Sequence, residues 1–143
     1  MKAWDLRMRT ARIIHLAFLL SVPILAVVGE FAGGLADPGE VESFAVIRLV
    51  FFVACATAAL IGFQFRARMI PVAMDALRRS RGDSDASQRW LSGHIIPYAL
   101  AETVAVCGFA LRFLGGTLYE SLPFYAIALG LLLAWMPRRA WSK

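Results

Sequence analysis

The fold is decided by the stretch 44–65, which reads FAVIRLVFFVACATAALIGFQF. It carries one charged residue, Arg48, and it reaches the roughly 20 apolar residues that a helix needs to cross the hydrocarbon core of a bilayer. The stretch 95–114 has the same character, and two shorter apolar blocks, 13–32 and 118–136, stand before and after this pair. The sequence therefore predicts an all-α, polytopic membrane protein with four transmembrane helices.

The overall composition favours the same class. Of the 143 residues, 59% are hydrophobic and 17% are charged, whereas a soluble domain has about 45–50% apolar and about 25% charged residues. The length suits one transmembrane domain, residues 1–143. A net charge of +5 also occurs in nucleic-acid-binding proteins, but here the basic residues flank the apolar blocks. We therefore expect lipid headgroups as their partners and no nucleic acid.

The basic residues are distributed unequally between the two predicted sides of the membrane. One side holds thirteen of the 15: Lys2, Arg7, Arg9, Arg12, Arg66, Arg68, Arg78, Arg79, Arg81, Arg89, Arg138, Arg139 and Lys143. The other side has Arg48 and Arg112 and most of the acidic residues near the spans: Glu30, Asp37, Glu40, Glu42 and Glu120. Because cytoplasmic segments are enriched in Lys and Arg, both termini and a loop at 66–94 are expected in the cytoplasm. The expected location is the cytoplasmic (inner) membrane of a bacterium.

The N-terminus allows a second interpretation. A charged segment at 1–12 followed by an apolar run is also typical of a secretory signal peptide. The site Gly34-Leu35-Ala36 is a poor cleavage motif and the apolar run is long, so we expect it to remain as the first span.

The cytoplasmic loop 66–94 is expected to begin as a helix. Apolar residues recur near helical spacing through 64–79, and Pro71 is a potential kink. We predict that this helix emerges along the membrane surface and ends at a turn at 81–85.

Glu102 is the main candidate for a functional residue. It lies about 10 Å into the third span, where an ionised, unpaired carboxylate costs at least a few kcal/mol. Tyr98, one turn earlier, could share a hydrogen bond with it. The functional interpretation is a proton or cation site, and the structural interpretation is a carboxyl group bonded to another helix.

The third span also predicts a packing face. Ala101, Ala105 and Gly108 fall on one narrow face of the helix, and small residues let a neighbouring helix approach closely. Arg112 lies at the outer end of this face, and we expect Glu30 to pair with Arg112 or with Arg48 in a structural charge cluster.

His15 and His94 are the only histidines, and both lie near the cytoplasmic ends of their spans. Two facing histidines could ligate a haem or a metal, whereas bonding to backbone, headgroups or water is the structural alternative. With no third ligand evident, we expect no cofactor. Cys55 and Cys107 fall inside apolar blocks and are interpreted as small buried hydrophobic residues.

Two short motifs stand on either side of the connection between the second and third spans. They read AMDALR at 73–78 and ALAETVAVCG at 99–108. In this arrangement the stretch 73–116 resembles the C-terminal hairpin of rotary ATPase proteolipids, the c subunits, which have an Arg-rich polar loop before a helix with an essential carboxyl group. The resemblance implies that Glu102 is an ion-binding carboxyl group and that Gly108 matches the family's following glycine.

The sequence departs from that family elsewhere. The resemblance covers less than a third of the chain, and the helix before the loop is dense in glycine in c subunits but bulky here at 49–55. Arg48, Arg112 and the first span do not fit a rotor ring. The resemblance thus implies a distant relation and not ATP synthesis.

No nucleophile elbow, Gly-rich phosphate loop or HExxH motif is present, so we expect no enzyme. The first functional hypothesis is an accessory or structural subunit that packs against other membrane components, as a homo- or hetero-oligomer. The alternatives are a proton- or cation-translocating protein that uses Glu102, and a haem-binding electron-transfer protein that uses His15 and His94.

Overall fold

The computed structural model describes residues 2–33, 44–80 and 82–137. It contains four helices: α1 (Lys2–Ala32), α2 (Phe44–Arg79), α3 (Ser84–Phe113) and α4 (Leu118–Ala134). The described parts of the chain contain no strand, so the predicted all-α class is confirmed. Three helices are long and apolar enough to cross a membrane, and α4, with 17 residues, is shorter.

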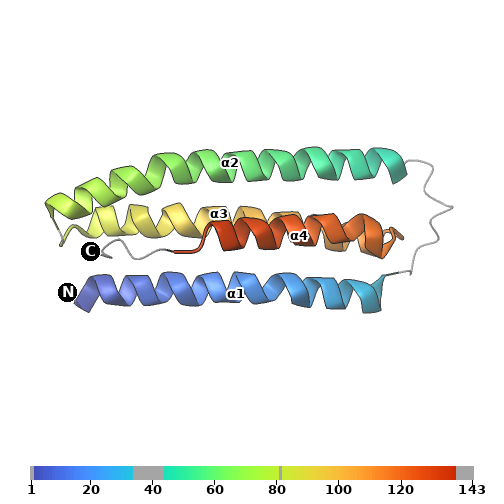
Figure 1. The fold of residues 1–143 in the computed structure, drawn as a ribbon, viewed down its shortest axis with the longest axis horizontal. Coiled ribbons are helices and arrows are strands. Elements are labelled where there is room, and N and C mark those ends of the chain that lie inside the picture. Colours follow the sequence, from blue (N-terminus) through green and yellow to red (C-terminus); the bar gives the residue numbers. More distant parts are fainter. Residues whose placement is uncertain (1, 34–43, 81, 138–143) are drawn as a thin grey trace.

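The helices run side by side, with α3 at the centre of the bundle (Figure 1). α3 contacts each of the other three helices, and α1 also packs against α4. α1 and α2 lie on opposite sides of the α3–α4 pair (Figure 1). This arrangement explains why α3 has many buried residues and α2 has few.

The core joins all four helices through apolar side chains. Val22 of α1, Cys55 of α2, Tyr98 of α3 and Phe124 of α4 are each at most 5% exposed and belong to one cluster. An aromatic contact joins α2 to α4, because the ring centroids of Phe52 and Phe124 lie 4.7 Å apart. The core therefore depends on packing between helices and not on any one of them.

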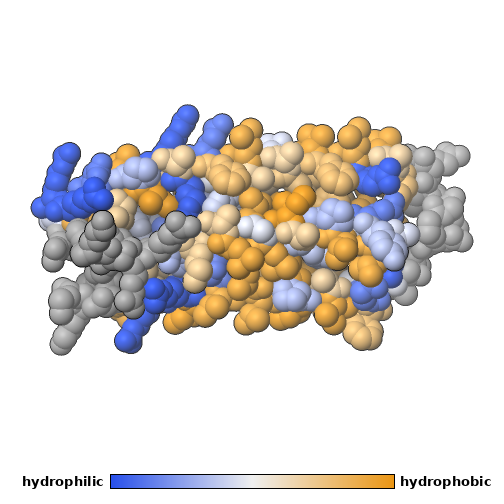
Figure 2. Space-filling model, viewed as in Figure 1, coloured by the Kyte–Doolittle hydropathy of each residue, from blue (hydrophilic) through white to orange (hydrophobic). Residues whose placement is uncertain are grey.

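The surface carries a broad apolar band. Large hydrophobic residues are exposed along α1 and α2, among them Leu20, Ile24, Leu49 and Leu60. Figure 2 shows this band across the middle of the molecule, with hydrophilic residues gathered at both ends. Soluble monomers rarely expose so large an apolar surface, so the band is compatible with a membrane location.

The segment 66–94 differs in part from the expected loop. The predicted helical continuation is present, because α2 runs without interruption through Pro71 to Arg79, and α3 begins at Ser84. The Asp83 carboxylate caps α3 by accepting hydrogen bonds from the backbone N–H groups of Asp85 and Ala86 at 2.9 and 3.0 Å. Most of the expected loop is therefore a helical hairpin.

The end of α2 packs inside the bundle instead of forming a separate surface helix. Ala73 and Leu77, one turn apart, are 1% and 4% exposed and belong to a second core cluster with Trp90 of α3 and Met8 and Ala11 of α1. Figure 1 shows α2 bending towards α3 in this part. The apolar spacing that predicted this helix is thus used to contact α1 and α3.

Candidate functional site

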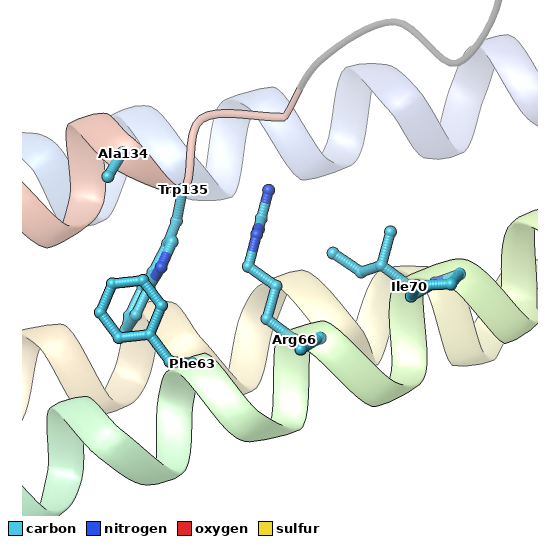
Figure 3. Close-up of a pocket in the computed structure, with 7 residues that line it drawn as sticks. Phe63, Arg66, Ile70, Ala134 and Trp135 are labelled. Atoms are coloured by element: carbon cyan, nitrogen blue, oxygen red, sulfur yellow. The ribbon is translucent and has the colours of Figure 1, made fainter.

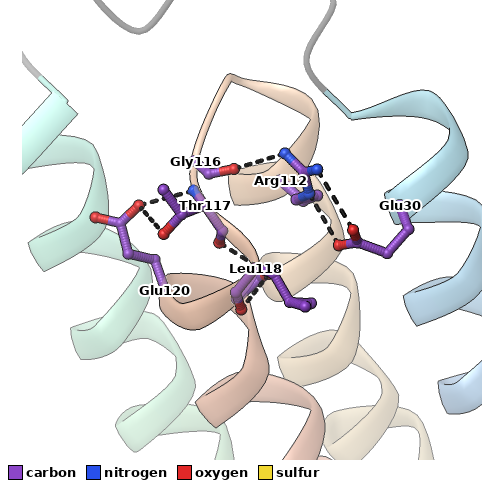
Figure 4. A network of polar contacts seen from close by, with 7 residues as sticks. Glu30, Arg112, Gly116, Thr117, Leu118 and Glu120 are labelled. Atoms are coloured by element: carbon purple, nitrogen blue, oxygen red, sulfur yellow. Dashed lines mark hydrogen bonds and ion pairs between the residues drawn. The ribbon is translucent and has the colours of Figure 1, made fainter.

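One ion pair at the bundle end where α4 begins joins α1 to α3. Arg112 donates to both carboxylate oxygens of Glu30, with its Nε 3.0 Å from Oε1, and donates to the Gly116 carbonyl at 2.9 Å (Figure 4). The Arg112 side chain is 19% exposed. This arginine therefore holds together α1, α3 and the connection to α4.

A second ion pair at the same end joins α2 to α4. Arg48 lies 3.0 Å from the Glu120 carboxylate, so it does not join Glu30. Glu120 also accepts hydrogen bonds from the Thr117 backbone N–H at 2.8 Å and from its hydroxyl at 3.0 Å, which forms a capping box at the start of α4 (Figure 4). Of the two pairings expected for Glu30, the one with Arg112 is present, and Arg48 forms a separate pair with Glu120.

The small-residue face of α3 packs against α4 of the same chain. Ala101 and Ala105 are fully buried. A Cβ atom built on Gly108 would lie 2.8 Å from the Phe124 Cβ and 3.2 Å from the Ser121 carbonyl oxygen. This face therefore serves the internal fold and is not available to another protein.

The two histidines meet at a buried tyrosine. His15 of α1 and His94 of α3 are 3% and 2% exposed, and their ring centroids lie 5.0 and 6.2 Å from that of Tyr98. The His94 Nδ1 bonds the Trp90 carbonyl at 2.9 Å, and because a carbonyl only accepts, Nδ1 carries the proton. Both imidazoles thus pack against the tyrosine ring and do not face an open site.

Tyr98 does not serve as a partner for Glu102. Its hydroxyl donates to the backbone carbonyl of Trp135 at 3.0 Å, at the end of α4. The Tyr98–Glu102 hydrogen bond that the spacing suggested is therefore not formed, because the tyrosine side chain reaches into the core and satisfies a carbonyl left open where α4 ends.

Arg66 belongs to the same cluster, although the sequence placed it among the loop cations. Its guanidinium is within hydrogen-bonding reach of the Tyr98 hydroxyl. Arg66 also follows Ala58 and Gly62 at helical spacing, and both of those residues are buried. That spacing could have placed Arg66 on the inner face of α2.

A groove lies beside the end of α4 because α2 continues past that point. Its volume is about 380 Å³, and it is lined by Phe63, Arg66, Ala67, Ile70, Pro71, Ala134 and Trp135. Figure 3 shows the Arg66 side chain extending from α2 towards the end of α4, near the indole ring of Trp135.

Glu102 lies at the border between the buried and exposed faces of α3. Ala101 before it is buried, Thr103 after it is exposed, and Glu102 itself is half-buried. No hydrogen bond or ion pair joins Glu102 to another residue within 2–33, 44–80 and 82–137. Its carboxyl group is therefore available to a partner outside the described chain.

The described residues hold no group of three or more His, Cys, Asp or Glu side chains that could bind a metal ion. Both imidazoles contact the Tyr98 ring, and no group of metal-binding side chains accompanies them among the described residues. Cys55 and Cys107 are both free thiols and lie within hydrogen-bonding reach of each other between α2 and α3.

Comparisons with protein-family models, with curated proteins and with solved structures find no match for this chain. The resemblance to proteolipid c subunits accordingly rests on the two sequence motifs alone.

Proposed function

We propose that this chain is a four-span integral membrane protein that acts, without enzymatic activity, as an accessory subunit packed against another membrane protein. Both termini and the 80–83 connection lie in the cytoplasm, and the membrane is the bacterial inner membrane. The apolar band around the bundle and the bias of Lys and Arg to one side support this placement.

Glu102 is the observation that carries the proposal of a partner. A carboxyl group in the apolar part of a span is costly unless it is neutral, hydrogen-bonded or paired. No described residue of the chain is bonded to it. A donor from a neighbouring membrane helix would satisfy it.

The surface next to Glu102 suits close approach of such a helix. Ala99 and Thr103 are both exposed on α3, within one turn of Glu102. The Thr103 hydroxyl donates to the Ala99 carbonyl at 2.9 Å. Its hydrogen is therefore already used, and the side chain can contact a neighbouring helix through its methyl group. Small residues of this kind are typical of helix–helix contacts in membranes.

The test is to purify the complex under mild detergent and identify its components by mass spectrometry. Glu102→Leu and Ala99→Leu should both release the partner, since the first removes the hydrogen bond and the second blocks close approach. Ala126→Leu, at an exposed position of α4, is the matched control and should retain it. Recovery of the wild-type chain alone, with no partner, would contradict the proposal.

A second candidate function is transport of a proton or cation by Glu102. This carboxyl group lies at the edge of the exposed face of α3, and that position favours a transport function. The resemblance to c subunits implies the same function. Glu102→Gln keeps the size and hydrogen-bonding ability but cannot exchange a proton. A Gln variant that keeps the partner but loses ion flux in sealed vesicles would favour transport, whereas unchanged flux would reject it.

A further inference from the structure

Two thiols lie opposite each other between α2 and α3. Cys55 of α2 is 5% exposed and belongs to the main core cluster, and Cys107 of α3 packs against that cluster. Their side chains are free thiols within hydrogen-bonding reach of each other. They are the two cysteines of the whole sequence, so no third thiol in the chain competes for either of them.

The register of α2 against α3 also brings the two cysteines to the same level. The two helices run side by side in opposite directions (Figure 1). A Cβ atom built on Gly93 of α3 would lie 3.2 Å from the Ile70 side chain of α2, so these two positions face each other. Cys55 lies 15 residues before Ile70, and Cys107 lies 14 residues after Gly93. Because the rise per residue is the same in both helices, the cysteines are nearly level.

The two helices remain close on the other side of the cysteines. A Cβ atom built on Gly116, just after α3, would lie 3.0 Å from the Phe44 ring at the start of α2. Packed helices have axes about 8–10 Å apart, with Cα atoms about 2.3 Å from each axis, so facing Cα atoms come within roughly 6 Å. A disulfide spans a Cα–Cα distance of roughly 4.4–6.8 Å. A bond between the two thiols therefore fits the packing of α2 on α3.

The two cysteines differ in their access to the surroundings of the bundle. Cys55 is buried, whereas Cys107 is half-buried and follows Val106, which is 45% exposed. The surface around Val106 belongs to the apolar band, so a reagent that reaches Cys107 has to dissolve in an apolar medium. An organic hydroperoxide such as an oxidised lipid has that property, and thiols are oxidised first to sulfenic acid.

We propose that Cys55 and Cys107 are a modification site, at which an organic hydroperoxide dissolved in the membrane forms a reversible disulfide between α2 and α3. Cys107 is the thiol that reacts with the peroxide, and Cys55 is the thiol that resolves the product. The bond would tie α2 to the helix that carries Glu102. The membrane placement proposed above enters only in the class of oxidant.

The reaction has two balanced steps. The Cys107 Sγ attacks the hydroxyl oxygen of the hydroperoxide, the O–O bond breaks, and the alcohol leaves with the proton of the thiol, so that Cys107 becomes a sulfenic acid. The Cys55 Sγ then attacks the Cys107 sulfur, the S–O bond breaks, and water leaves with the proton of the second thiol. The two thiols lose two electrons and the peroxide gains them, so no further oxidant is needed.

The experiment treats the full chain, purified with reductant in detergent and then freed of it, with cumene hydroperoxide. The readouts are the intact mass and the number of thiols that a maleimide labels after denaturation. We expect the wild-type chain to lose two hydrogen atoms, about 2 Da, and both thiols, and to regain them with dithiothreitol. A chain that keeps both thiols, or that forms disulfides only between two chains, would overturn the proposal.

The matched control moves one thiol by one residue. Val106→Cys combined with Cys107→Ala keeps two cysteines in the chain, but position 106 is on the exposed side of α3 and not opposite Cys55. This variant should form no disulfide within the chain. If it formed one as readily as the wild type, oxidation would not depend on the facing pair, and the proposal would fail.

Single variants test the order of the two steps. Cys55→Ala should stop at the Cys107 sulfenic acid, which dimedone labels, because the resolving thiol is missing. Cys107→Ala should show far less dimedone labelling, since Cys55 is buried. Equal labelling of the two variants would overturn the assigned roles. The wild-type measurement remains decisive if a variant fails to fold, and its failure would leave the partner test at Glu102 unaffected.

Discussion

The Tyr98 hydroxyl and the Trp135 carbonyl, 3.0 Å apart, join the middle of α3 to the end of α4. Tyr98 is fully buried and also contacts the His15 ring. Removing the hydroxyl leaves the Trp135 carbonyl without this donor in a dry environment. Tyr98→Phe should therefore lower the free energy of unfolding by about 1–3 kcal/mol, measured by thermal or denaturant unfolding in detergent.

The control for Tyr98 is Tyr119→Phe. Tyr119 is 85% exposed, so loss of its hydroxyl should have little effect on stability. Equal destabilisation by the two substitutions would show that the Tyr98–Trp135 bond is not important to the fold.

Gly108 and Gly130 give a matched pair for the packing of α3 on α4. A Cβ atom at Gly108 would lie 2.8 Å from the Phe124 Cβ, which cannot move without shifting α4, whereas at Gly130 it meets nothing within 4 Å. Gly108→Ala should therefore destabilise the protein by about 1–3 kcal/mol, and Gly130→Ala should be neutral or slightly stabilising. The measurement is the midpoint of thermal unfolding, and an opposite order would mean that α3 and α4 are less closely packed than described.

The Glu30–Arg112 pair should behave as a coupled unit. Arg112→Leu should cost more stability than Glu30→Gln, because Arg112 also bonds the Gly116 carbonyl and is the less exposed partner. The double variant should cost less than the sum of the two, with a coupling of about 0.5–1 kcal/mol for a pair this exposed. Arg48→Leu combined with Glu30→Gln is the control and should be additive, since Arg48 pairs with Glu120.

Regular patterns in the sequence were sufficient to predict the helical class and the length of α2, although not its packing inside the bundle. Apolar residues near helical spacing after the second span predicted that the helix would continue to Arg79, and it does. Such patterns depend only on neighbours along one helix, which is why they can be read from one chain.

Contacts between helices could not be predicted in the same way. Arg48 pairs with Glu120 because α2 lies next to the start of α4, and Arg66 reaches Tyr98 because α2 also lies next to α3. Helix adjacency and the point at which a short α4 ends are properties of the tertiary structure. The one-turn spacing of Tyr98 and Glu102 suggested a hydrogen bond between them. The sequence could not show that the Trp135 carbonyl, on another part of the chain, would be the acceptor instead.

The proposed orientation can be tested with two single cysteines in a chain lacking Cys55 and Cys107. Tyr119→Cys is at the end of the bundle with the two ion pairs, and Gln88→Cys is exposed near the start of α3. If basic segments face the cytoplasm, a membrane-impermeant maleimide should label Tyr119→Cys on intact cells and Gln88→Cys only after lysis. Labelling of Gln88→Cys alone on intact cells would reverse the orientation. Labelling of both would mean that the two ends of the bundle lie on the same side of the membrane, and the four-span arrangement would have to be abandoned.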